Sequence, residues 1–287
     1  MQKNNNLSPL PWYDSISEQN HRKPYAYGSV YPLYCAMGSV PPFQIQMPHS
    51  TATIEAVKLV TFDDGIEVDV TQAMIQAGLQ VVRYATDGYD NVVYSPVVSF
   101  GITTQEGRYY MVMTMSDGTV YYSEVFTVVA DMSGYVFVQW WDEQDFIMDD
   151  SRITYSTGYR NSLWLQTQIG KPDYEFQEDG EQRDGYFFPE KMVSEKTFKF
   201  VILAPEYLCD VMRFIRMSDY VFVRDQWGRM YRCDTFLVTP EWQEQGDLAS
   251  VTVEFTCDTV AKKIGTGYVR TFDGADFNND FNNDFNN

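Results

Sequence analysis

Cysteine and histidine are scarce in this sequence of 287 residues, with four cysteines and two histidines. No two cysteines form the close pair that zinc sites require, so the equal spacing of Cys209, Cys233 and Cys257 is interpreted as coincidence. Cys35 is likewise expected to be structural. His21 and His49 stand in Pro-containing stretches, and no Gly-x-Ser-x-Gly motif occurs. The sequence therefore disfavours a Ser or Cys hydrolase.

Phosphate-binding motifs and basic patches are also missing. Neither a Gly-x-Gly-x-x-Gly motif nor a P-loop occurs, and 40 Asp and Glu residues outnumber 21 Lys and Arg residues, for a formal net charge of −19. Such a surface repels phosphate backbones. Nucleotide chemistry and sequence-specific nucleic-acid binding are therefore not expected.

Long apolar runs are absent as well. No stretch approaches the ~20 apolar residues of a membrane helix, and the N-terminal segment MQKNNNLSPLPWYDSIS lacks the apolar centre of a signal peptide. A soluble protein made in the cytoplasm, without a membrane partner, is expected.

Aromatic residues, in contrast, are abundant: the chain has 21 Tyr, 19 Phe and 6 Trp. A tyrosine hydroxyl requires water or a polar partner, so many of these rings must lie at surfaces or interfaces. Two interpretations stay open, namely sugar-stacking platforms and large subunit contacts, where Tyr and Trp are enriched.

The first part of the chain predicts an extended arm and an immunoglobulin-like β-sandwich. Residues 1–42 show no sustained periodicity and should be ordered only where they lie on something else. From residue 43 to residue 131, short alternating segments predict antiparallel strands, with a tight hairpin at Asp117 and Gly118. One helical turn is predicted, with Thr71 as N-cap and Gly78 just past its end.

The second part, residues 132–265, predicts a β-barrel or β-sandwich domain with one packed helix. The helix is expected over residues 205–217, because apolar residues recur there at helical spacing. An acidic and aromatic loop is expected over residues 170–191. The fold class is therefore all-β with one helix.

The predicted loop is a candidate protein-contact element, because exposed rings lower the solubility of a monomer and the loop exceeds ordinary connection lengths. Its contact candidates are Tyr174, Phe176, Tyr186, Phe187 and Phe188.

The C-terminal tail, residues 266–287, ends in three DFNN repeats and is expected to be flexible. A calcium loop is excluded there, because Phe281 stands where the loop needs Gly and Asn287 stands where it needs an acid. Phe277, Phe281 and Phe285 are predicted to dock on a partner. Deletion of residues 276–287 should leave the fold intact and weaken assembly.

Two further functions compete with protein contact. Trp140, Trp141 and Trp164 are candidates for glycan contact in a carbohydrate-binding module. Acidic residues beside two of these tryptophans allow a carboxylate-pair glycoside hydrolase, whose candidates are Asp142, Glu143, Asp145, Asp149 and Asp150. A solvated acidic loop explains the same residues more simply.

Long segments of the chain resemble tail-associated structural proteins of tailed phages and prophages of Bacteroidetes, including crAss-like phages. The resemblance is carried by GYRNSLWLQTQIGKPDYEFQEDGEQRDGYFFPEK, VSEKTFKFVILAPEYLCDVMRFIRMSDYVFV and CDTFLVTPEWQEQGDLASVTVEF, and also by RYYMVMTMSDGTVYYSEVFTVV and the DFNND repeats. It implies a non-enzymatic virion protein without catalytic residues, metal or cofactor. Its implied partners are further copies in a symmetric ring and the neighbouring ring, portal-proximal and fibre proteins, with assembly in the bacterial cytoplasm.

Overall fold

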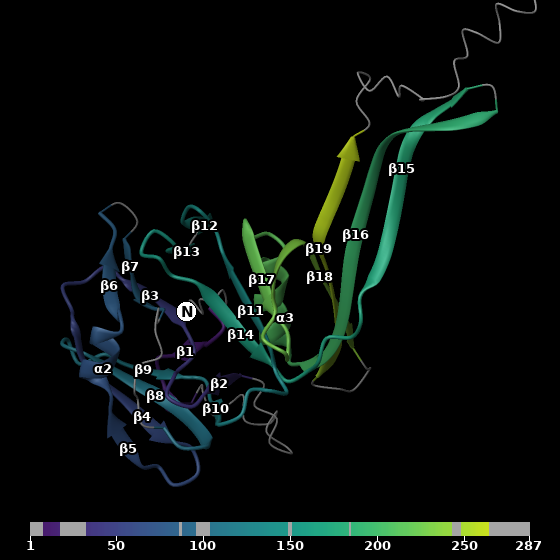
Figure 1. Ribbon diagram of the computed structural model, residues 1–287. Helices are drawn as coiled ribbons and strands as arrows, with labels where there is room; N and C mark the ends of the chain where they lie inside the picture. Colours follow the sequence, from purple (N-terminus) through teal and green to yellow (C-terminus); the bar gives the residue numbers. More distant parts are fainter. Residues whose placement is uncertain are drawn as a thin grey trace, which may run out of the picture. The chain divides into compact units, whose positions relative to one another are not determined.

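The computed structural model describes residues 8–17, 33–85, 88–95, 104–148, 151–183, 185–242 and 248–263 (Figure 1). Strands account for 57% of the structure and helices for 8%, which confirms the predicted all-β class. The chain divides into two compact units. The first comprises Met1–Asp173 and Lys196–Asp258, and the second comprises Tyr174–Glu195 and Thr259–Asn287.

The N-terminal half of the first unit is built around one long central strand, β8 (Gly107–Met115). On one edge, β8 pairs with β4 (Ile54–Thr61), which pairs in turn with β5 (Glu67–Asp69). On its other edge, β8 pairs with β9 (Val120–Ser123) and β10 (Phe126–Val129). The tight turn between β8 and β9 is confirmed, since Gly118 has a φ angle of 87° and its N–H donates to the Met115 carbonyl.

A second, smaller sheet faces the same core. It has the order β3 (Phe43–Pro48), β7 (Tyr89–Tyr94) and β6 (Gln80–Arg83), and all its pairs are antiparallel. Ile45 from this sheet and Met111 from β8 belong to one cluster of buried apolar residues. Two sheets thus share a core, as in a β-sandwich.

The predicted helical turn between these sheets is α2 (Thr71–Gln76), and Gly78 follows it with a φ angle of 101°. The expectation of Thr71 as N-cap is wrong, because the cap position is Val70 and no side chain caps the helix. The Thr71 hydroxyl instead accepts a hydrogen bond of 2.8 Å from the Val57 N–H of β4. Thr71 therefore ties the helix to the strand beside it.

Two short strands from the N-terminal 42 residues complete this part of the sheet. β1 (Trp12–Tyr13) pairs with β9. β2 (Tyr34–Ala36) pairs in parallel with β10 on one side and antiparallel with β14 on the other. This arm is therefore ordered where it lies against other strands, and β2 joins the strands of both halves of the chain.

The C-terminal half continues the sheet from β2 through β14, β11, β17, β18, β19 and β16 to β15. The bounds of these strands are β11 Val136–Trp141, β14 Asn161–Leu165, β15 Asp173–Arg183, β16 Tyr186–Ala204, β17 Tyr220–Arg224, β18 Met230–Trp242 and β19 Ala249–Lys263. A separate two-stranded sheet consists of β12 (Phe146–Met148) and β13 (Ser151–Ile153).

The predicted long helix is confirmed as α3 (Glu206–Ile215), which begins after Pro205 and has Arg216 at its C-cap. Its buried stripe consists of the four residues that the periodicity predicts, Leu208, Val211, Met212 and Ile215. These residues join the same apolar cluster as β17, β18 and β19.

The segment 170–191, predicted as a loop, contains the whole of β15 and the beginning of β16 instead. The division of the chain at residue 131 stays a prediction, and hydrogen-bonded pairing continues across it through β2. The tail with Phe277, Phe281 and Phe285 lies outside the described residues.

Candidate functional site

The first candidate surface is the hairpin formed by residues 174–195, which we call the hairpin arm (Figure 1). Along β15, every residue from Asp173 to Gln182 is exposed, whereas β11 alternates between buried and half-buried residues. An alternating pattern is typical of a strand with one face on a core. The strand β15 therefore has no face packed on a core of its own.

Large apolar side chains nevertheless lie on this arm. The exposed fractions are 63% for Tyr174, 73% for Phe176, 72% for Tyr186 and 49% for Phe187. These are four of the five contact residues predicted from the sequence, and the side chain of Phe188 lies outside the described residues. Large rings that are about half exposed or more, on a strand without a core of its own, are suited to contact with another molecule.

The turn of the arm is set by glycine. Gly185 has a φ angle of 84°, in the left-handed region, and the residue before it in the sequence is Asp184. Asp-Gly between two strand-like runs is a strong hairpin signal, because a two-residue turn of the favoured type needs positive φ angles. The Asp184-Gly185 dipeptide is therefore the sequence signal that favours a hairpin over the predicted loop in this segment.

The arm is also strongly acidic on β15. That strand carries five carboxylates, Asp173, Glu175, Glu178, Asp179 and Glu181, and one basic residue, Arg183. Because side chains alternate across a strand, Glu175, Asp179 and Glu181 share one face while Tyr174 and Phe176 share the other. One face of the strand is thus negatively charged, and the other is aromatic near its start.

The second candidate surface is one face of the sheet in the first unit, over β2, β14, β11, β17 and β18. The registers of the paired strands place residues of neighbouring strands opposite each other in rows. One row runs Tyr34, Trp164, Phe137, Arg224, Met230; the next runs Ser162, Gln139, Phe222, Arg232; and the third pairs Trp141 with Tyr220. Residues opposite each other on paired strands share a face, and we call this set, with Arg160, the arginine–aromatic face.

The other side of the same strands is the core. Val138, Leu163 and Val223 alternate with members of the arginine–aromatic face and are buried, whereas all members of that face are half-buried or exposed. The alternation explains why these strands form: the apolar residues of one side bury surface, and the other side is free to carry rings and charges.

Rings and guanidinium groups alternate across this face. The guanidinium of Arg160 lies 4.2 Å from the ring centre of Trp141, whose ring stacks on Phe222 with 5.2 Å between ring centres. Arg224 lies over Phe137 and Trp164, at 5.1 and 4.7 Å, and Arg232 lies 5.4 Å from the ring centre of Tyr220. Stacking on an aromatic ring holds a guanidinium in place and leaves its N–H donors at the edge free to bind.

In the part of the chain that the structure describes, Arg160, Arg224 and Arg232 form no ion pair with a carboxylate. Basic residues are the minority in this chain, with 21 Lys and Arg against 40 Asp and Glu. Three arginines held on rings without a carboxylate partner are therefore available to an anionic ligand.

A cleft of about 200 Å³ opens on the same face. Its walls include Tyr34, Phe137, Arg160 and Trp164, together with residues 39–42. For scale, an apolar cavity of about 150 Å³ holds a benzene molecule, so this cleft has room for one aromatic ring.

The three predicted glycan-contact tryptophans have different environments. Trp140 is 1% exposed and belongs to the core, so it is not available to a sugar. Trp141 lies between Arg160 and the rings of Phe222 and Tyr220. Trp164 packs against Phe137 and lies under Arg224. The rings of Trp141 and Trp164 are thus occupied by protein neighbours, which disfavours a sugar-stacking platform.

The acidic residues after β11 bind backbone groups. Asp142 accepts a hydrogen bond from the Asp219 N–H at 2.8 Å, and the Asp219 carboxylate accepts one from the Glu143 N–H at 3.0 Å. The carboxylate of Asp145 accepts hydrogen bonds from the N–H groups of Tyr155 and Ser156. Burial raises the pKa of Asp142 above its ordinary value. These carboxylates hold loops together, and Asp149 and Asp150 lie outside the described residues.

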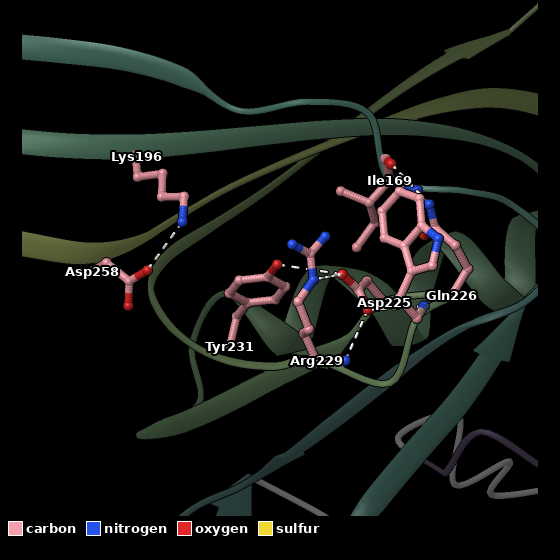
Figure 2. A network of polar contacts seen from close by, with 8 residues as sticks. Ile169, Lys196, Asp225, Gln226, Arg229, Tyr231 and Asp258 are labelled. Carbon is pink, nitrogen blue, oxygen red and sulfur yellow. Dashed lines mark hydrogen bonds and ion pairs between the residues drawn. The ribbon is translucent and has the colours of Figure 1, made fainter.

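A network of polar contacts fixes the turn between β17 and β18 (Figure 2). The buried carboxylate of Asp225 accepts hydrogen bonds from the Arg229 Nε at 2.7 Å, the Tyr231 hydroxyl at 3.3 Å and the Trp227 N–H at 3.0 Å. Burial alone raises the pKa of the Asp225 carboxyl, but the hydrogen bonds from Arg229 and Trp227 outweigh it, so this pKa lies below its ordinary value.

The same network continues to the segment before β15. The Gln226 side chain and the Ile169 backbone exchange two hydrogen bonds, each of 3.1 Å (Figure 2). At the tip of the turn, Trp227 is 67% exposed, with the Arg229 guanidinium 4.9 Å from its ring centre. Sequence reasoning missed this exposed ring, because it considered only Trp140, Trp141 and Trp164, although the run from Asp225 to Gly228 is a recognisable turn.

The cysteines occupy buried or half-buried positions, and all four are free thiols. The structure places Cys233 and Cys257 opposite each other on β18 and β19, which sequence spacing did not predict. Burial raises the pKa of the Cys257 thiol to about 11. Within the described ranges, no group of three or more His, Cys, Asp or Glu residues is arranged to hold a metal ion. The described helices include none that is long and apolar enough to cross a membrane.

Comparison of the sequence with protein-family models and with curated proteins finds no match. The function is therefore inferred from the two surfaces described above and from the resemblance of the sequence to tail-associated proteins.

Proposed function

We propose that the protein is a non-enzymatic structural subunit of a ring in the tail or neck of a tailed bacteriophage. In this role it assembles in the bacterial cytoplasm, forms a symmetric ring with its own copies and stacks on other tail proteins below the portal. Its rim supports fibres. The sequence resemblance to tail-associated proteins motivates the proposal.

The exposed aromatic rings of the hairpin arm are the main support for the proposal. Four large rings are exposed on a hairpin whose strand β15 is exposed at every residue from Asp173 to Gln182. Aromatic residues are enriched at the centres of protein interfaces and depleted on free surfaces. A ring subunit contacts several neighbours, so an arm of this composition is suited to it.

The acidic charge also fits this role. A formal net charge of −19 does not favour binding to phosphate backbones, so DNA can pass a ring of such subunits without being retained. The Asp142 carboxylate accepts a hydrogen bond from the Asp219 N–H, and the Glu143 carboxylate accepts one from the Tyr220 hydroxyl. This arrangement supports a structural role for both carboxylates.

Electron microscopy and light scattering of the purified protein, together with mass spectrometry of purified particles, test the proposal. The wild type should form rings or rise in mass with concentration, and it should be present in virions. Phe176→Ser combined with Tyr186→Ser should reduce ring formation, because it removes two exposed rings of the arm.

The matched control is Ile66→Ser combined with Met217→Ser, which removes exposed apolar side chains outside the arm. It should assemble as the wild type does. A protein that is monomeric at every concentration and absent from purified particles would refute the proposal.

A further inference from the structure

We propose that the arginine–aromatic face of one copy of this chain receives the acidic hairpin arm of a second copy. This inference rests on the proposed function, since it names the partner of the arm as a neighbouring subunit. The contact joins two different surfaces, so it is heterologous, and repeated contacts of this kind close into a ring when the rotation between copies permits it.

Charge complementarity is the first argument. β15 carries five carboxylates and one arginine. The arginine–aromatic face presents Arg160, Arg224 and Arg232, which have no ion-pair partner among the described residues. In a chain with almost twice as many acidic as basic residues, a surface with three unpaired arginines is the natural acceptor for an acidic strand.

Spacing is the second argument. Arg160 directly precedes β14, and Arg232 lies on β18, three strand intervals away through β11 and β17. At about 4.8 Å per interval across the strands, and with an offset of two residues along them, the two positions lie roughly 16 Å apart. Glu175 and Asp179 lie on one face of β15, four residues and roughly 13 Å apart. The difference is within the reach of the long arginine side chains, so a strand laid across the sheet can contact both arginines with both carboxylates.

Preorganisation is the third argument. Arg160 is held on Trp141, and Arg232 lies against Tyr220. A guanidinium fixed by stacking loses little conformational freedom when it binds a carboxylate through two N–H donors. The stacked arginines can therefore bind carboxylates with a small loss of side-chain conformational entropy.

The cleft supplies an apolar element to the same contact. Its volume of about 200 Å³ and its walls of Tyr34, Phe137 and Trp164 suit one aromatic side chain. The arm carries such side chains on its second strand, at Tyr186 and Phe187, whereas Tyr174 and Phe176 lie on the face of β15 opposite to Glu175 and Asp179. An aromatic ring buried in a pocket of the partner is typical of a binding hot spot.

The test uses charge reversal on the full-length protein. A face variant, Arg160→Glu with Arg232→Glu, and an arm variant, Glu175→Lys with Asp179→Lys, should each weaken self-association about tenfold or more in analytical ultracentrifugation at low salt. A chain that carries all four changes restores opposite charges across the contact and should return to within about threefold of the wild-type affinity. Added salt should weaken the wild-type association.

Matched controls change the net charge equally at other exposed sites. Arg213→Glu with Lys58→Glu is the control for the face variant, and Glu55→Lys with Asp64→Lys is the control for the arm variant. Both should associate as the wild type does. Thermal unfolding of each variant shows whether the variant is folded, so that weaker association can be distinguished from loss of the folded structure.

Several outcomes would overturn the inference while leaving the proposed function intact. One is a face variant that associates normally while the arm variant does not, which assigns the arm to a different surface. Another is a protein present in virions whose association is insensitive to all four changes. Binding of a single-stranded oligothymidine that requires Arg160 and Arg232 but not the arm would reassign the face to nucleic acid. A protein that neither associates nor occurs in particles contradicts both proposals.

Discussion

Two strands of this chain, β11 and β15, show how differently a strand can be stabilised. β11 (Val136–Trp141) buries every second side chain in the core and presents the others on the arginine–aromatic face. β15 (Asp173–Arg183) is exposed at every residue from Asp173 to Gln182. The residues of β11 are explained by its own fold, whereas the rings of β15 are largely exposed. The proposed contact with a neighbouring subunit would account for them.

The largest difference in stability is expected when a ring is removed from β11. Trp140→Ala should lower the free energy of unfolding by about 3 to 5 kcal/mol, because Trp140 is buried in the core and the change leaves a cavity. Urea denaturation followed by fluorescence or circular dichroism measures it. A loss below about 1 kcal/mol would contradict the assignment of Trp140 to the core.

A second test concerns the carboxylate that fixes the turn between β17 and β18. Asp225→Asn should cost about 1 to 3 kcal/mol at neutral pH, because the buried acceptor loses its charge while Arg229 and Trp227 keep their donors. Asp64→Asn, at an exposed site, is the control and should cost almost nothing.

The same substitution predicts a pH dependence. The folded pKa of Asp225 lies below the ordinary value of 3.8, so its stabilising contribution is present above that value and is lost as the pH falls through the folded pKa. The difference in stability between wild type and Asp225→Asn should therefore shrink as the pH is lowered below 3.8. A difference that stays constant down to strongly acidic pH would contradict the lowered pKa.

A smaller effect is expected at the turn of the arm. Gly185→Ala should cost about 1 kcal/mol, because alanine is strained at a φ angle of 84°. The loss should appear as faster amide hydrogen exchange within residues 174–195, with little change in the first unit. Gly134→Ala, at a position with open space around the added carbon and no positive φ angle, is the matched control.

The smallest effect on stability is expected for the ring of β15 with the greatest exposure. Phe176→Ala should change the free energy of unfolding by less than about 0.5 kcal/mol, because the side chain is 73% exposed. Its contrast with Trp140→Ala measures how differently the two strands use their rings. A loss of 2 kcal/mol or more would show that the arm packs on its own chain.

Sequence patterns predicted the elements whose signals are local. The β8–β9 hairpin followed from Asp117 and Gly118, and the buried stripe of α3 followed from its helical spacing. The sequence of the arm predicts a loop because β15 lacks the alternation of buried and exposed residues that a core imposes. Only the Asp184-Gly185 pair indicates a hairpin. Its aromatic contact candidates were nevertheless named from composition.

The arginine–aromatic face could not be predicted in this way. Its members come from five strands spread between Tyr34 and Arg232, and they meet only through the registers of β14, β11 and β17. A shift of one residue in any register would place them on the core side. Trp140 and Trp141 illustrate the point, since adjacent positions in one strand have opposite environments.

The three-residue strand β2 has a consequence for the order in which the chain folds during synthesis. Tyr34 pairs with Thr127 in β10 and with Trp164 in β14. The ribosome must therefore release most of the first 165 residues before β2 can be enclosed between its neighbours. Until then the edges of β10 and β14 stay open, and unpaired edges are where nascent chains associate wrongly. Contacts between residues so distant in sequence also form slowly, so the enclosure of β2 should be slower than the formation of the local β8–β9 hairpin.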